Sequence, residues 1–204
     1  MEIKRLPLGP IEANCYLLST KKAAVVIDPG FYSKEVLDFL QQNRDKERLI
    51  LLTHGHFDHI GFACELRKET DTEIAIGIAD AEYLSNENLN LSAQFGMPLV
   101  PFSADILLND LEEFSVGDIS FKVIHTPGHT PGGVCYLVSN YLFSGDTLFN
   151  LSIGRTDFPL GDYNTLENSI KKLYKLDPET IVLSGHGPKT AIKFEKSHNP
   201  YIRG

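Results

Sequence analysis

The chain has 204 residues, of which 42% are hydrophobic, and this composition suits one globular domain spanning residues 1–204. No run approaches the roughly 18 apolar residues of a membrane helix, and no apolar segment follows the first charged residues as in a secretory signal. The 19 Lys and Arg residues against 27 Asp and Glu residues give a formal net charge of −8, without the basic patch typical of nucleic-acid binding. These features predict a cytoplasmic protein that acts on a small molecule and binds neither nucleic acid nor a membrane. They leave the oligomeric state open.

In the first half of the chain, short apolar runs alternate with amphipathic stretches. The apolar runs predict strands at Cys15–Leu18, Ala23–Asp28, Leu49–Leu52 and Glu73–Ile76. The run Leu49–Leu52 is wholly apolar, which is typical of a strand covered on both faces. The amphipathic stretches predict helices from the N-cap Ser33 to about Asn43, from about His59 to Glu69, and from Ala79 to Ser85.

The second half is richer in strands. The stretch Asn86–Ala104, which precedes it, has no clear period and is interpreted either as a lid or binding loop or as a solvated connector. Strands are predicted at Ser120–Ile124, Gly133–Val138, Tyr141–Ser144 and Thr180–Ser184, with a helix at about Leu166–Leu176. Because strands and helices alternate in both halves, the simplest architecture is sheet packed on sheet with helices outside.

Three cysteines, Cys15, Cys64 and Cys135, are widely spaced and odd in number. No C-x-x-C pair occurs among them, so we expect neither a disulfide framework nor a cysteine metal site. They are interpreted as the reduced thiols of a cytoplasmic protein.

The densest group of potential metal ligands is the run Thr53-His54-Gly55-His56-Phe57-Asp58-His59. Side chains two apart in an extended segment point the same way, so His54 and His56 can face one point after their strand. Asp58 and His59 begin the next predicted helix and can face a second point close by. Taken alone, Asp58 is consistent with a helix N-cap, and a single histidine is consistent with a packing role. Three histidines and an aspartate within six positions favour a metal site instead. Imidazole and carboxylate ligands together suit zinc, iron or manganese.

Three later segments each place a metal-capable side chain after a strand and a turn, and each has a small residue just before it. They contain Gly128-His129, Gly145-Asp146 and Gly185-His186. Small residues let a backbone approach a metal closely. With the first run these segments supply seven ligands, enough for two adjacent metals that share a carboxylate: His54, His56, Asp58, His59, His129, Asp146 and His186.

The pattern H-x-H-x-D-H, followed by a distant His, Asp and His, resembles the metallo-β-lactamase superfamily. The resemblance extends over nearly the whole chain, from Asn14-Cys15-Tyr16 through Asp28-Pro29-Gly30 to Gly185-His186-Gly187. It implies a mixed α/β fold, an αββα four-layer sandwich with the metals at one edge of the two sheets. The resemblance assigns His54, His56 and His129 to the first metal. It assigns Asp58, His59 and His186 to the second metal and Asp146 to both.

Two further histidines are left out of the ligand set. His125 lies in the same turn as His129, and the resemblance favours His129, which directly follows Gly128. His125 is therefore expected either to contact a metal ligand without binding metal itself or to pack against neighbouring side chains. His198 lies in a polar tail and is expected to be exposed.

The ligand set predicts a metal-dependent hydrolase. Two close divalent metals, expected to be zinc with iron or manganese as alternatives, lower the pKa of a bridging water toward about 7. The resulting hydroxide attacks an activated carbonyl or phosphoryl centre. Asp58 is the candidate catalytic residue, because its carboxylate can ligate a metal and also orient the nucleophile through a hydrogen bond.

Within the superfamily the chain resembles the short bacterial glyoxalase II-like group, and glyoxalase II proteins hydrolyse hydroxyacylglutathione thioesters. Asp146 argues against a true β-lactamase, because the resemblance implies that lactamases lack the bridging aspartate. Only Gly187–Gly204 follow the last ligand, without the C-terminal helical, glutathione-binding domain of longer glyoxalase II proteins. The resemblance therefore implies a thioester hydrolase whose thiol carrier stays open.

Arg155 is the candidate for binding a substrate carboxylate, through its planar guanidinium. An ion pair with Asp157 or Asp162 is the alternative role, and the sequence does not separate the two. Lys189 and Lys193 are weaker candidates for the same contact.

Persulfide dioxygenases of the same fold are the alternative function. They resemble this chain in much of the ligand set and in the Gly-Arg-Thr-Asp-Phe segment. They hold a single iron through two histidines and one carboxylate, here His54, His129 and Asp146. Iron held in this way suits oxygen chemistry. A purely structural metal site is disfavoured, because such sites are closed and usually rich in cysteine.

Overall fold

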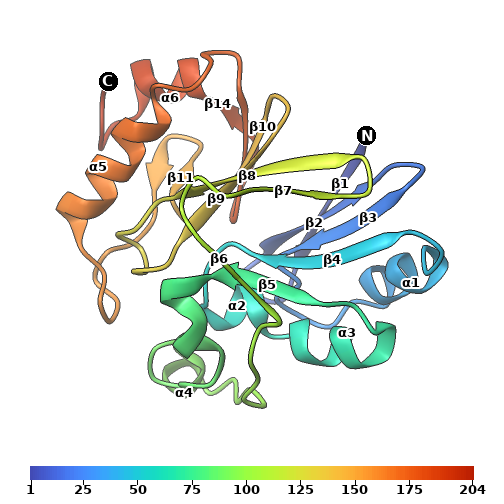
Figure 1. The fold of residues 1–204 in the computed structure, drawn as a ribbon. Coiled ribbons are helices and arrows are strands. Elements are labelled where there is room, and N and C mark those ends of the chain that lie inside the picture. The colour runs from blue at the N-terminus through green and yellow to red at the C-terminus, as the bar shows by residue number, and fades with distance from the viewer.

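The computed structural model describes residues 1–204 and consists mainly of two six-stranded sheets packed face to face, with helices on their outer sides (Figure 1). In spatial order, the first sheet contains β1 (Glu2–Leu8), β2 (Ala13–Ser19), β3 (Ala23–Ile27), β4 (Glu47–Leu52), β5 (Ile74–Gly77) and β6 (Ile106–Leu108). The second contains β14 (Thr190–Ala191), β13 (Ile181–Ser184), β10 (Tyr141–Gly145), β9 (Val134–Val138), β8 (Ile119–His125) and β7 (Glu113–Val116). A small third sheet pairs β11 (Leu148–Phe149) with β12 (Ser152–Ile153). The expected αββα sandwich is confirmed.

Strand direction decides which loops meet. Strands β3, β4, β5 and β6 run parallel to one another, and β10 runs parallel to β13. β8 and β10 are both antiparallel to β9, so these two strands also point the same way. The carboxyl ends of strands from both sheets therefore lie at one edge of the sandwich, which is where open α/β sheets place their functional loops.

The core consists of three clusters that follow the alternation of side chains along the strands. In β4, Leu49 and Leu51 pack between the two sheets, whereas Ile50 and Leu52 pack beneath the helices on the outer face. Both faces of this strand are buried, which explains its wholly apolar sequence. The third cluster packs the second sheet against α5 (Tyr163–Leu173) and α6 (Ile192–His198).

Helix α1 (Lys34–Gln42) begins as predicted at Ser33, whose side chain accepts a hydrogen bond from the N–H of Val36. Val36 and Leu40 are buried on its inner face. Helix α5 begins earlier than predicted, because the side chain of Asp162 caps it by accepting from the N–H of Thr165 at 2.7 Å. The predicted short helix at Ala79–Ser85 is a 3₁₀ helix, η1 (Ile78–Leu84).

The continuous helix predicted from His59 to Glu69 is wrong. Two helices occupy this region, α2 (Phe57–Ile60) and α3 (Ala63–Thr70). The break follows from a tertiary contact, since the N–H of Phe62 donates to the carbonyl of Pro29 at 2.9 Å instead of continuing the helical ladder. Asp58 and His59 thus lie in a separate short helix held against the turn at residues 28–30.

The segment Asn86–Ala104 is irregular apart from a short helix, α4 (Ser92–Phe95). Phe95 of this helix stacks on Phe57 of α2, with ring centroids 5.2 Å apart, so the segment reaches the helix that carries Asp58. Whether it closes over a substrate stays a prediction. The sequence analysis did not predict strands β1, β6, β7, β11, β12 and β14 or helices α4 and α6. None of the helices is both long and apolar enough to cross a bilayer.

Candidate metal centre

All seven predicted ligands come together at the edge where the strands end. Four lie in the turn after β4 and in α2, and the other three follow β8, β10 and β13. Their ligand atoms form three overlapping groups, and within each group all atoms lie within 4.8 Å of one another: His54, His56 and His129; His54, His59 and Asp146; and Asp58, His59 and His186. The first and third groups match the two metal positions expected from the resemblance.

Two of the histidine rings are held in orientation by hydrogen bonds at the ring nitrogen that points away from the site. Nδ1 of His59 lies 3.0 Å from Oδ2 of Asp28, and Nδ1 of His129 lies 2.6 Å from the carbonyl oxygen of Arg155. Both partners accept a hydrogen bond, so each Nδ1 carries a proton and each Nε2 is the nitrogen that faces the site. This is the arrangement in which histidine binds a metal through Nε2.

Several polar atoms that face the site are buried without a hydrogen-bond partner, namely Nε2 of His54, Nε2 of His59 and Oδ1 of Asp146. In addition, Nδ1 of His56 lies 2.9 Å from Nε2 of His129, so two ring nitrogens face each other. An unsatisfied buried polar group costs about 1–3 kcal/mol, and cations bound by the two ligand sets would satisfy these atoms. The donor set of imidazole nitrogens and carboxylate oxygens therefore fits divalent metal ions.

Asp146 lies between the two sets of ligands. Its Oδ1 is 3.4 Å from Nε2 of His59, and its Oδ2 is 3.5 Å from Nε2 of His129 and 3.7 Å from Nε2 of His186. A single carboxylate therefore reaches histidines of both sets, as a bridging ligand must.

The protonation of the histidines differs between the two sets. Burial lowers the pKa of His54 far below its usual value, and burial together with the nearby His129 lowers the pKa of His56 to about 3. Burial also acts to lower the pKa of His59, but the charges of Asp58 and Asp146 outweigh it and hold that pKa well above its usual value. Without metal, His54 and His56 are therefore neutral, whereas His59 is protonated among carboxylates.

Two glycines let the backbone come close to the ligands. A Cβ on Gly185 would overlap with Oδ1 of Asp146 and would lie 2.8 Å from Cε1 of His59. A Cβ on Gly30 would overlap with the carbonyl oxygen of Asp58. Neither position admits a larger residue without moving a ligand.

Sequence reasoning missed the role of Asp28, because it placed this residue only at the end of the predicted strand Ala23–Asp28 and in the segment Asp28-Pro29-Gly30 of the resemblance. Besides its contact with His59, its carboxylate accepts hydrogen bonds from the N–H and the hydroxyl of Thr53, each at 2.7 Å. It therefore connects α2 to the end of β4. Its position directly after an apolar strand, like that of the predicted ligands, is a signal that could have revealed it.

Asp80 was also missed, and no local pattern marks it. It is fully buried in η1 and accepts hydrogen bonds from the N–H of Gly55, the hydroxyl of Thr130 and the N–H of Gly132. Burial raises its pKa, although these hydrogen bonds oppose the shift. The residue joins the loop of His54 and His56 to the loop of His129.

The residues left out of the ligand set lie outside all three groups. Nε2 of His125 is 2.8 Å from the carbonyl oxygen of Pro131, and the ring of His198 stacks on Phe194. The three cysteines are free thiols and join no ligand group.

Arg155 is exposed and paired with Asp157, at 2.9 Å and 2.6 Å, and its guanidinium lies 4.1 Å from the ring centroid of Phe158. The structure therefore shows the alternative role, the ion pair, while carboxylate binding stays a prediction. Its backbone carbonyl has a second role, since it orients His129. Asp162, the other candidate partner, caps α5 instead.

The sequence of this chain is similar to those of known proteins. The model of the Metallo-beta-lactamase superfamily matches residues 8–186. The chain belongs to this superfamily. It is 37% identical to the probable metallo-hydrolase YqgX of Bacillus subtilis (strain 168), over 100% of this chain and 99% of that protein. It is also 37% identical to the hydroxyacylglutathione hydrolase GloC of Haemophilus influenzae, over 99% of this chain and 98% of that protein.

Solved structures of superfamily members show the same architecture. The BLEG-1 B3 metallo-beta-lactamase is 41% identical, with a TM-score of 0.92 over 100% of both chains. TTHA1623, solved in a di-iron-bound form, is 34% identical, with a TM-score of 0.86 over 98% of this chain and 100% of that one. ETHE1 from Myxococcus xanthus is 29% identical, with a TM-score of 0.80 over 99% of this chain and 84% of that one. Family and site together identify a metallo-hydrolase of this superfamily.

Proposed function

We propose that this protein is a dinuclear metallohydrolase that cleaves small-molecule thioesters, as hydroxyacylglutathione hydrolases do. The observation that carries the proposal is the position of Asp146, whose two carboxylate oxygens face histidines of different ligand sets. A carboxylate in this position can bind two ions at once and hold them about 3.5–4 Å apart, the spacing of two-metal hydrolytic sites. We expect zinc in both positions, with iron or manganese as alternatives.

In the proposed reaction, the oxygen of water bonds to the thioester carbonyl carbon and the C–S bond breaks. The thiol leaves with one proton of the water, and the acid product leaves as a carboxylate after the other proton has passed to solvent. Bound metal ions supply a water-derived nucleophile at neutral pH and polarise the carbonyl. The chain supplies the fixed ligand positions and a group that orients the nucleophile.

Asp58 is the residue that we assign to orientation. Its Oδ2 lies 3.2 Å from Nε2 of His186 and 3.4 Å from Nε2 of His59. Burial acts to raise its pKa, but the charge of His59 and the hydrogen bond from His186 outweigh burial and hold that pKa well below its usual value. The carboxylate is therefore ionised at neutral pH and can accept a hydrogen bond from the attacking water.

Aromatic side chains beside the ligands support an acyl thioester as substrate. The ring of Phe158 lies 5.5 Å from that of His56, and the ring of Phe149 lies 6.2 Å from that of His186. These rings offer apolar contacts next to the metal ligands. The relative GloC, a hydroxyacylglutathione hydrolase, supports the same substrate class.

The second candidate function is persulfide dioxygenation with a single iron. The similarity to ETHE1 from Myxococcus xanthus favours it, and so does the distance of 3.5 Å between Nε2 of His129 and Oδ2 of Asp146, two of the three ligands that a single iron would use. β-Lactam hydrolysis belongs in the same comparison, because BLEG-1 is 41% identical to this chain. The three candidate enzymes differ in the metal that they bind, and their reactions differ in the bond that breaks.

One set of measurements separates them. Metal analysis of the purified protein is combined with turnover of a hydroxyacylglutathione thioester, oxygen uptake with glutathione persulfide, and hydrolysis of a β-lactam. We expect two metal ions per chain and thioester turnover at least about tenfold above the other two activities. One iron per chain with persulfide-dependent oxygen uptake would establish the dioxygenase instead, and dominant β-lactam cleavage would establish a lactamase.

The Asp58→Asn variant tests the proposed role of Asp58. We expect thioester turnover to fall by at least about 100-fold, the usual contribution of a positioned acid–base group, while at least one metal stays bound. Asp45→Asn is the matched control, because Asp45 is exposed in a turn. If the Asp58 variant turned over thioester normally, another group would have to orient the nucleophile.

A further inference from the structure

Both open edges of the sandwich leave a cavity between the two sheets, and the two cavities differ in charge. One lies between β6 and β7 and measures about 360 Å³, and the other lies beside β1 and β13 and measures about 500 Å³. We call them the acidic cavity and the basic cavity, after the charged side chains that line them. None of the seven metal ligands lines either cavity, so both are separate from the metal centre.

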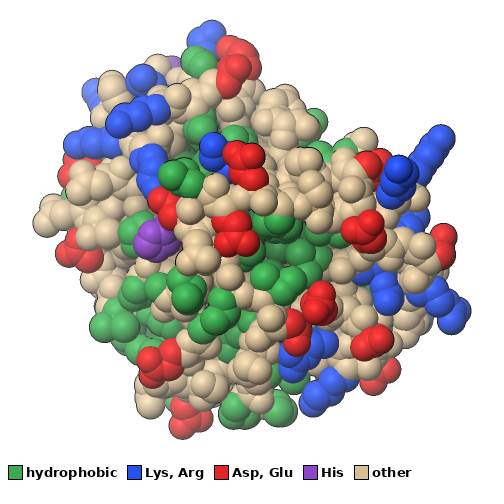
Figure 2. All heavy atoms as spheres, in the orientation of Figure 1, with side chains coloured by type: hydrophobic (Ala, Val, Ile, Leu, Met, Phe, Trp, Pro, Cys, Tyr) green, Lys and Arg blue, Asp and Glu red, His purple; other side chains and the backbone are tan.

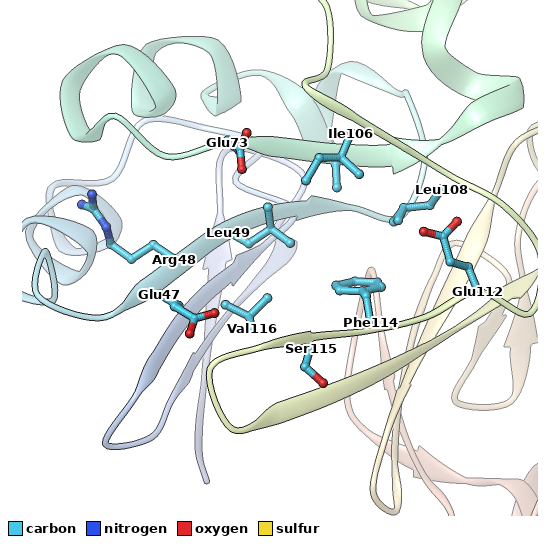
Figure 3. A pocket seen from close by; sticks show the side chains of 11 residues that line it. Glu47, Arg48, Leu49, Glu73, Ile106, Leu108, Glu112, Phe114, Ser115 and Val116 are labelled. Carbon is cyan, nitrogen blue, oxygen red and sulfur yellow. The ribbon is translucent and has the colours of Figure 1, made fainter.

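The acidic cavity combines apolar side chains with three carboxylates, those of Glu47, Glu73 and Glu112. Hydrophobic side chains gather between the sheets with acidic side chains around them (Figure 2), and the three glutamates surround this apolar wall (Figure 3). Arg48 is the one basic residue of its lining, and its guanidinium donates to the carbonyl of Leu40 at 3.3 Å. Carboxylates therefore dominate this cavity, and they would repel an organic anion.

The basic cavity has an equally apolar wall. Ile3 of β1 faces the space between the sheets, whereas Leu6 and Leu8 of the same strand pack beneath the helices. Tyr141 of β10 and Ile181 of β13 approach from the second sheet. The volume of about 500 Å³ lies within the usual range of small-molecule pockets.

Two cationic side chains line the basic cavity at the end formed by the loop after β13. One guanidinium nitrogen of Arg5 donates to the carbonyl of Gly187 at 2.7 Å, which places Arg5 against this loop. Lys189, two residues further along the loop, also lines the cavity and forms no ion pair with the protein. By contrast, Lys4 on the opposite face of β1 is paired with Glu35.

No carboxylate lines the basic cavity, although the chain as a whole has a net charge of −8. An apolar wall with positive charge at one end matches a ligand with an apolar body and one negatively charged group. Arg presents a planar fork of N–H donors that suits carboxylate, sulfonate or phosphate oxygens, and Lys adds a point charge.

We propose that the basic cavity binds a soluble small anionic amphiphile. Its carboxylate, sulfonate or phosphate group meets Arg5 and Lys189, and its apolar chain or ring lies against Ile3, Tyr141 and Ile181. The proposal does not depend on thioester hydrolysis. No residue of this cavity is a metal ligand, and Lys189, a weaker candidate for substrate binding from the sequence, lines this cavity.

Calorimetric titration of the purified protein, with its metals bound, tests the proposal. The probe is 1-octanesulfonate, because a sulfonate is a weak metal ligand and leaves the metal centre alone. We expect one saturable site per chain. Octylammonium, with the opposite charge, and methanesulfonate, without the apolar chain, should each bind at least about tenfold more weakly.

Variants assign the site. Lys189→Gln removes one cation without removing the hydrogen bond between Arg5 and Gly187, and we expect it to weaken octanesulfonate binding about tenfold. Lys171→Gln is the matched control, since Lys171 is paired with Glu167 on α5, and it should leave the affinity unchanged. Glu73→Gln, in the acidic cavity, should also leave it unchanged.

Any of four results would overturn the proposal. These are the absence of saturable binding, octylammonium binding as tight as that of octanesulfonate, full affinity in a chain that carries both Arg5→Gln and Lys189→Gln, and a larger effect of Glu73→Gln than of Lys189→Gln.

Discussion

The chemistry of the metal centre depends on which nitrogen of each histidine carries a proton. The carboxylate of Asp28 and the carbonyl of Arg155 accept from the Nδ1 atoms of His59 and His129, so the opposite nitrogens face the site. A neutral imidazole can bind a metal at once, whereas a protonated one must first lose a proton. The two ligand sets therefore respond differently to pH.

We predict that metal is lost first from the set that contains His59 as pH falls. The pKa of His59 is raised by neighbouring carboxylates, so protons compete with metal there below that pKa and cease to compete above it. The pKa values of His54 and His56 are lowered, and these rings stay neutral throughout the range. Metal content measured from about pH 8 down to about pH 6 should fall from two ions to one. Simultaneous loss of both ions would contradict this order.

The second prediction at this scale concerns Asp28. Asp28→Asn removes the charge behind His59 but keeps an oxygen that can accept from Thr53. The backbone at this position has a φ of +53°, which asparagine tolerates. We expect metal affinity to fall about 10–100-fold, the usual effect of losing such a partner, with little change in the folded structure. Competition titration with a coloured zinc chelator measures it, and an unchanged affinity would show that the carboxylate does not support His59.

At the scale of the elements, the site depends on strand ends that lie against each other. Asp146 follows β10 and His186 follows β13, and these parallel neighbours bring their loops together. Gly185 lies at the contact, because a Cβ there would overlap with Oδ1 of Asp146. The geometry of the ligands therefore depends on a residue that binds nothing itself.

We predict that Gly185→Ala displaces Asp146 and weakens the bridge between the two ligand sets. Activity should fall by about 100-fold, since a shift of about 1 Å in a catalytic geometry can have that effect. Gly187→Ala is the control in the same loop, because a Cβ there meets no atom within 4 Å, although its φ of +72° adds backbone strain. Metal content and turnover of the two variants decide the question, and equal losses in both would remove the steric explanation.

At the scale of the whole molecule, the ligands connect the two sheets. His54 and His56 follow a strand of the first sheet, and the loops of His129, Asp146 and His186 belong to the second. Backbone contacts span the same interface, as in the hydrogen bond from Val134 to the carbonyl of Thr53 at 2.8 Å. Metal that binds only the folded chain should therefore stabilise the whole sandwich.

We predict a clear loss of thermal stability when metal is removed. At a free metal concentration of about 100 times Kd, binding adds ~2.7 kcal/mol to the free energy of unfolding. For a chain of this size, that corresponds to a rise in Tm of roughly 5–10 °C. Calorimetry of the protein with zinc and with a chelator measures the shift. A chelator that removed the metal without lowering Tm would contradict the prediction.

Much of this fold and site followed from local sequence. The seven residues predicted as ligands lie together in the structure, because each follows a strand end by a short distance in the chain. The wholly apolar run in β4 revealed a strand buried on both faces, and Ser33 revealed the start of α1. Such features depend on alternation and capping within a few residues, which are visible in one dimension.

Tertiary contacts decided the rest. The break between α2 and α3 arises from a hydrogen bond to Pro29, more than thirty positions away in the chain, and Arg155 pairs with Asp157 although two partners were open. Asp80 gains its role from loops that lie 25 and 50 or more residues away. The two oppositely charged cavities exist only because the sheets separate at their edges. No local pattern encodes these contacts, since their energies depend on which distant groups the fold brings together.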